Sequence, residues 1–170
     1  TFSVYCAAAI LYMMKQQRDA IGLTTFSEQV DVQTQVKSST IHHKLVFAHL
    51  EKLLESKADV KRKTATADAL HQLAESIHER SLIIIFSDMF ENTDSNEALF
   101  KSLQHLKHNK HEVVLFHVTD HDTELAFNFN ERPYEFIDLE SGEKLTLNPH
   151  EIKDRYEKEL KEYHAKLKMK

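Results

Sequence analysis

The sequence predicts a single α/β domain over residues 1–170, with a mostly parallel sheet flanked by helices. Three observations predict this class. Two runs made only of apolar residues, Leu82–Phe86 and Val113–Phe116, are typical of strands buried on both faces of a parallel sheet. Helical spacing of leucines between these runs predicts a strand–helix–strand crossover. The 170 residues, 41% apolar and 29% charged, suffice for one hydrophobic core, and no internal repeat divides them.

The first third of the chain predicts two helices with two strands between them. Residues from Ser3 to about Gln17 form an unusually apolar segment, which predicts a helix packed under the sheet. Ala20–Phe26 predicts a strand, and the alternation over Gln29–Gln35 predicts an adjoining one. Apolar residues at helical spacing predict the second helix over about Ile41–Glu55, followed by a polar, basic surface loop over residues 56–63.

The middle of the chain predicts two helices that flank the first apolar strand. One begins near Thr66. The other follows a capping box made by Asp94 and Glu97, because a short polar residue and a glutamate three positions later satisfy the free N–H groups of a helix start.

After the second apolar strand the pattern changes to a hairpin and a final helix. Tyr134–Leu139 and Lys144–Leu147 predict short strands on either side of a turn that contains Gly142. Asn148 predicts the cap of the last helix and Pro149 its first position, where the missing N–H of proline costs nothing.

Charge, cysteine count and hydropathy exclude several classes of protein. The net charge of −5 comes from mixed acidic and basic residues, which disfavours a nucleic-acid partner. A single cysteine, Cys6, excludes an internal disulfide and a cysteine-rich zinc site, and its apolar surroundings predict a buried bystander. The longest apolar run, Val4–Met14, is about half the ~20 residues that cross a bilayer, so we expect no membrane contact from it.

The strongest candidate site lies where the first apolar strand ends. Ligands of parallel sheets bind at the carboxyl ends of the strands, and here the strand ends in Ser87 and Asp88. A rigidly held carboxylate and nearby hydroxyls suit Mg²⁺, which prefers oxygen ligands and keeps several waters. Thr64, just before a predicted helix, is the third candidate ligand. A strand-end aspartate can also simply cap the following turn.

A second group of polar residues follows the other apolar strand and supports an alternative function. His117, Asp120 and His121 together with Asp88 are the set that a metal-dependent phosphatase or hydrolase would use. The alternative to a metal-binding or catalytic role is that the twelve histidines of the chain, including His42 and His43, are solvated or hydrogen-bonded. The chain has no G-x-S-x-G turn, no HExxH motif and no glycine-rich phosphate loop, so the sequence favours a protein that is not an enzyme.

Four separated segments resemble a known family in the same order. They read DAIGLTTF over Asp19–Phe26, TATADAL over Thr64–Leu70, LIIIFSD over Leu82–Asp88 and RPYEFIDLESGE over Arg132–Glu143. This succession resembles the von Willebrand factor type A-like (Rossmann-like) domains, and more narrowly the bacterial domain-of-unknown-function family 58. The resemblance runs from about residue 4 to 160.

The resemblance implies a metal ion-dependent adhesion site, in which Mg²⁺ keeps a free position for an acidic group of a partner protein. Thr64 matches the threonine of that site and Asp88 its second aspartate. The Asp-x-Ser-x-Ser motif of the family is absent. In family order it would precede Thr1 on the first strand, and a last strand would follow Lys170, so the chain resembles a domain truncated at both ends. We therefore expect an incomplete metal site.

The resemblance also implies a setting for the domain. Related domains are associated with MoxR-type AAA+ ATPases, so the implied role is an adaptor that binds such an ATPase in the bacterial cytoplasm. A third expectation is a structural fragment whose open sheet edges promote self-association.

Overall fold

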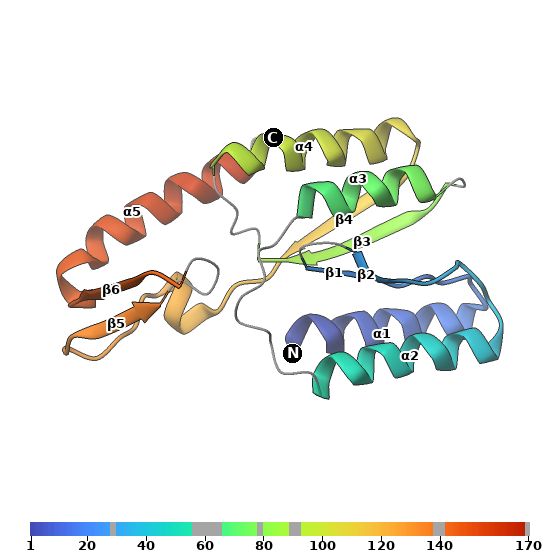
Figure 1. Cartoon of the computed structure of the whole chain (residues 1–170), viewed down its shortest axis with the longest axis horizontal. Coiled ribbons are helices and arrows are strands. Elements are labelled where there is room, and N and C mark those ends of the chain that lie inside the picture. Colours follow the sequence, from blue (N-terminus) through green and yellow to red (C-terminus); the bar gives the residue numbers. More distant parts are fainter. Residues whose placement is uncertain (28–29, 56–65, 78–79, 89–92, 138–141, 169–170) are drawn as a thin grey trace.

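The structure is a computed structural model and describes residues 1–27, 30–55, 66–77, 80–88, 93–137 and 142–168. The described chain is a mixed α/β structure with six helices, which confirms the class (Figure 1). The elements, in chain order, are α1 (Phe2–Gln17), β1 (Thr24–Phe26), β2 (Val30–Gln33), α2 (Thr40–Glu55), α3 (Thr66–Ser76), β3 (Leu82–Ser87), α4 (Thr93–His108), β4 (Glu112–His117), the π-helix η1 (His121–Leu125), β5 (Tyr134–Ile137), β6 (Lys144–Leu147) and α5 (Pro149–Lys168).

The expectation of one mostly parallel sheet is wrong for the described residues, which form three two-stranded sheets. β3 and β4 pair in parallel, with Ile84 opposite Val114, as the two apolar runs predict. β1 pairs only with β2 and is antiparallel to it, and β5 pairs with β6 in the expected hairpin. The strand predicted over residues 20–26 is shorter in the structure, where β1 has three residues and Ile21 forms only an isolated bridge with Lys37. The register of β1 on β2 also shifts between Thr25 and Phe26.

The main core lies between β3–β4 and the helices α3 and α4. In the view of Figure 1 these helices cover the upper side of the strands, whereas α1 and α2 lie below them. The core consists of the buried residues Leu70, Ala74, Ile83, Ile85 and Leu106. Side chains alternate along a strand, so every second residue of β3 and β4 faces the helices.

The other face of β3–β4 corrects the expectation that these strands are buried on both sides. Leu82, Val114 and Phe116 are 54%, 41% and 44% exposed, because the helices α3 and α4 cover only the opposite face. An all-apolar run therefore does not by itself establish burial on both faces.

Helix α1 also differs from its expected packing. It forms where predicted, but none of its residues is buried, and Phe2, Tyr5 and Tyr12 are among its exposed apolar side chains. Cys6 is accordingly half-buried. Its neighbour α2 does bury one face, through Val46 and Leu50. Within the described part of the chain no helix combines the length and the apolar character needed to span a bilayer.

A second, smaller cluster joins the C-terminal elements through aromatic rings. Phe127, after η1, is buried and stacks on Tyr156 of α5 with 4.3 Å between ring centroids. Phe129 meets both Tyr134 and Phe136 of β5 edge-on at 5.3 and 5.4 Å. The rings thus fix the hairpin β5–β6 to α5, beside β4 in the chain but outside the main core.

Candidate functional site

The candidate site is the carboxyl end of the parallel pair β3–β4, where two predicted polar segments meet. Ser87 and His117 are register partners, and the backbone N–H of Val118 donates to the carbonyl of Ser87 at 2.9 Å. The next residue, Asp88, has an exposed side chain, and its backbone carbonyl lies 2.8 Å from His117 Nε2. A carbonyl can only accept, so Nε2 carries the proton and donates it there. The structure therefore brings Ser87, Asp88 and His117 together as predicted.

Asp120 also follows the carboxyl end of β4, but its side chain caps the N-terminus of η1. Its Oδ1 accepts from the backbone N–H of Thr123 at 2.8 Å and from the Thr123 hydroxyl at 2.9 Å. These two hydrogen bonds, the backbone one first, lower the pKa of the Asp120 carboxyl. The backbone N–H of Asp120 donates in return to Glu124 Oε2 at 2.8 Å. Asp120 is thus a helix cap of the kind that satisfies free N–H groups.

The set of residues required by the hydrolase hypothesis does not converge in the described part of the chain. The ring of His121 lies against its neighbour Asp122, with Nδ1 3.2 Å from Oδ1, and both side chains are about four-fifths exposed, at 81% and 80%. No group of three or more His, Cys, Asp or Glu side chains able to hold a metal occurs among the described residues. The π-helix itself was not predicted, because no element was assigned from the sequence between the second apolar strand and the hairpin.

Two of the three predicted Mg²⁺ ligands lie within the described residues. Ser87 is half-buried and Asp88 exposed, and both supply the oxygen atoms that Mg²⁺ prefers. Thr64, the third predicted ligand, lies outside the described residues. The donor chemistry of Ser87 and Asp88 fits Mg²⁺, although two ligands cover only part of its coordination shell.

One further residue at this end of the sheet comes from α5. The ring of His164 stands edge-on to that of His117, with 5.2 Å between centroids and planes 82° apart. The contact joins two residues far apart in the chain. Because His164 lies four positions after Leu160, which the helical spacing places on the apolar face of the last helix, periodicity is the signal that could have placed it there.

We expected the remaining histidines to be hydrogen-bonded or solvated, and the structure confirms this for some of them but not for His111. His42 is buried and its Nε2 lies 2.9 Å from the carbonyl of Ile21, as expected. His111 is also buried, at 5% exposure, but neither ring nitrogen has a hydrogen-bond partner among the described residues. His71 and His105, which the sequence did not connect, lie side by side on α3 and α4.

Next to the strand ends lies an exposed apolar surface on the outer face of β3–β4. It consists of two cross-strand pairs, Ile84 with Val114 and Phe86 with Phe116. The rings of Phe86 and Phe116 are stacked, with 5.0 Å between centroids and planes 11° apart. We call these four residues the outer apolar face.

Comparison with known proteins identifies one family. The family model described as "Protein of unknown function DUF58" matches residues 2–166. No curated protein matches the chain, and no solved structure does.

Proposed function

Because the chain belongs to the DUF58 family, we propose that it is a protein-binding domain of the von Willebrand factor type A-like kind and not an enzyme. In this proposal a partner protein binds across the outer apolar face and the adjoining carboxyl end of β3–β4. The family description assigns no activity, so the support comes from the surface itself.

The outer apolar face is the observation that carries the proposal. Folded proteins rarely expose contiguous apolar patches, and those that they do expose often bind other proteins. Val114 and Phe116 are more than two-fifths exposed, at 41% and 44%, and they lie in register with Ile84 and Phe86 on the neighbouring strand. Aromatic side chains, phenylalanine included, are enriched in the cores of protein interfaces.

The strand-end residues add a polar edge to this surface. Asp88 and Ser87, with Thr64, would hold Mg²⁺ in a remnant of an adhesion-type site. When bound, the ion would offer a free position to an acidic side chain of the partner. His117 contributes by holding the backbone of Asp88 through the 2.8 Å hydrogen bond to its carbonyl.

The partner that we propose is a MoxR-type AAA+ ATPase, and the setting is the bacterial cytoplasm. Both rest on the resemblance of the four sequence segments to the family, since no residue contact specifies the partner. Membership of the family across residues 2–166 supports carrying this association to the chain.

The proposal is tested by measuring binding of a purified MoxR-type ATPase by isothermal titration calorimetry, with Mg²⁺ and with EDTA. Phe116→Asp introduces a charge into the outer apolar face at its stacked aromatic pair. Leu145→Asp makes the same change at an apolar side chain of β6 that is 60% exposed, and is the matched control. Asp88→Ala removes the carboxylate at the strand end.

We expect F116D to abolish binding of the ATPase and L145D to preserve it. D88A should remove only the increase in affinity that Mg²⁺ produces relative to EDTA. Equal affinity for the wild type and F116D would refute the assignment of the binding surface. Absence of any binding to the ATPase would refute the proposed partner. Hydrolysis of a phosphoester that D88A abolishes would refute the non-enzymatic role.

A further inference from the structure

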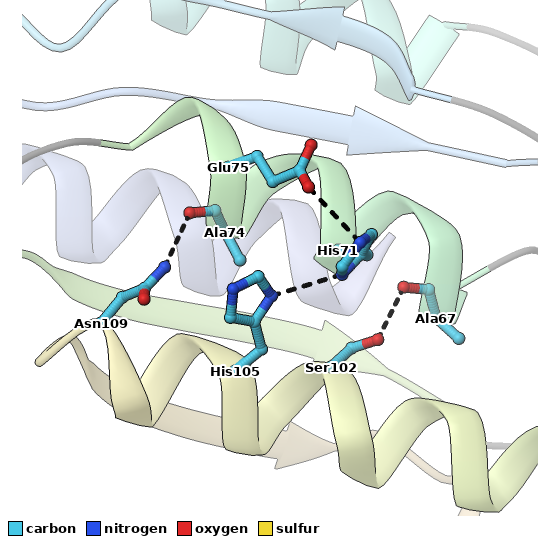
Figure 2. A network of polar contacts seen from close by, with 7 residues as sticks. All are labelled: Ala67, His71, Ala74, Glu75, Ser102, His105 and Asn109. Atoms are coloured by element: carbon cyan, nitrogen blue, oxygen red, sulfur yellow. Dashed lines mark hydrogen bonds and ion pairs between the residues drawn. The ribbon is translucent and has the colours of Figure 1, made fainter.

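Two histidines from adjacent helices face each other on the surface that covers the main core. Nδ1 of His71 on α3 lies 3.3 Å from Nδ1 of His105 on α4. Their ring centroids are 5.1 Å apart and the planes meet at 40° (Figure 2). The two residues are 34 positions apart in the chain, so only the packing of α3 on α4 brings them together.

The distance between the nitrogens is also the one that two ligands of a single metal ion adopt. In the metal-free chain the two nitrogens, 3.3 Å apart, share one proton in a long hydrogen bond. Two nitrogens bound to one tetrahedral Zn²⁺ at about 2.05 Å are roughly 3.3 Å apart, and the centroids of their rings roughly 5.2 Å apart. The observed 3.3 and 5.1 Å agree with both values.

The carboxylate of Glu75 lies beside Nε2 of His71, the ring nitrogen that does not face His105. Oε1 of Glu75 lies 3.5 Å from His71 Nε2, one helical turn along α3. The negative charge of this carboxylate favours the tautomer with the proton on Nε2, and in that tautomer the lone pair is on Nδ1, the nitrogen nearest His105. Carboxylates hold many metal-binding histidines in this way and increase the basicity of the ligand nitrogen.

The two helices are held at the spacing that the pair requires. On one side of it Ser102 Oγ donates to the carbonyl of Ala67 at 2.9 Å, and on the other Asn109 Nδ2 donates to the carbonyl of Ala74 at 3.1 Å. Figure 2 shows these two contacts flanking the histidines along the line between α3 and α4. Leu106 is fully buried beneath the line. Little reorganisation is therefore needed for binding.

We propose that His71 and His105 form a surface site for Zn²⁺ that links α3 to α4. The site is open to solvent, since the side chain of His71 is 55% exposed. No third His, Cys, Asp or Glu completes a metal-binding group in the described part of the chain, so water fills the remaining positions. Imidazole nitrogens select a borderline ion such as Zn²⁺ over Mg²⁺, which separates this site from the oxygen ligands at the end of β3.

The test is a titration of the metal-free chain with Zn²⁺, followed by calorimetry and by the NMR signals of the imidazole rings. We expect one equivalent of Zn²⁺ to shift the signals of His71 and His105 together. His105→Gln and His71→Gln should each weaken this site about tenfold or more. Glu75→Gln should weaken it about tenfold, through loss of the carboxylate behind the ring. The control is His108→Gln, the same change one turn later on α4 at an exposed histidine, and it should leave affinity unchanged.

The melting temperature supplies a second readout that is independent of the NMR assignment. Zn²⁺ that binds only the folded chain must raise stability, so we expect a rise in the wild type and in H108Q but not in H105Q. Melting in EDTA checks that the variants fold. Equal Zn²⁺ affinity in the wild type and H105Q would overturn the proposal. So would an equal loss in H108Q, because it would place the ion on α4 alone.

Discussion

Removing Leu106 tests whether the layer between α3, α4 and β3–β4 is the main core. Leu106 is 0% exposed and packs in one cluster with Leu70, Ala74, Ile83 and Ile85. Leu106→Ala removes buried methyl groups and leaves a cavity, at a cost of about 3 kcal/mol in the free energy of unfolding. Total stabilities are about 5–15 kcal/mol, so this is a large fraction.

The assay is urea denaturation followed by circular dichroism, together with thermal melting. A loss of about 3 kcal/mol lowers the melting temperature of a chain of this length by roughly 6–12 °C. The matched control is Leu145→Ala on β6, where the side chain is 60% exposed and the expected change is within about 0.5 kcal/mol. A loss below about 1 kcal/mol in L106A, or equal losses in both variants, would refute the position assigned to the core.

Three further predictions follow from single contacts. Ser102→Ala removes the hydroxyl that donates to the carbonyl of Ala67 at 2.9 Å. Chemical denaturation should show that the free energy of unfolding falls by about 1 kcal/mol. An unchanged free energy of unfolding would mean that this hydrogen bond does not hold α4 on α3. The lowered pKa of Asp120 means that its stabilising effect is present above the unfolded-state pKa and is lost as the pH falls through the folded-state pKa. The wild type should therefore have a higher free energy of unfolding than Asp120→Asn at neutral pH, and this difference should disappear in acid. A difference that does not change with pH would contradict the capping role. Burial, and then the charge of Glu124, raises the pKa of Tyr156 above the usual 10.0 of tyrosine. In a spectrophotometric titration of the tyrosines, the component that ionises at the highest pH should therefore disappear in Tyr156→Phe and remain in the control Tyr5→Phe.

Local patterns predicted the elements well because each depends on neighbouring residues. The spacing of leucines placed α4, and the all-apolar runs placed β3 and β4 and their parallel pairing. Asn148 and Pro149 placed the start of α5. These signals are local, since caps and periodicity act within one or two turns.

What the sequence did not predict depends on packing between distant segments. An apolar run cannot show whether one face or both are covered, so the exposure of Val114 and Phe116 was missed. Apolar composition likewise did not reveal that α1 has no buried residue. At the candidate site, the meeting of Ser87, Asp88 and His117 was predictable from strand ends. The approach of His164, and the pairing of His71 with His105, were not, because each joins separate helices.

The aromatic cluster around Phe127 has a consequence for how the molecule opens. The hairpin β5–β6 and α5 are joined to one another by the contacts of Phe127 and Phe129, whereas α5 meets β4 through the rings of His164 and His117 and the leucine core lies elsewhere. Such a unit can detach and reattach as one cooperative segment without global denaturation, and its amide hydrogens would then exchange with solvent together and ahead of those in β3 and β4. The chain contains no tryptophan, so a tryptophan placed at Phe129 would report this partial opening by fluorescence without competing signals.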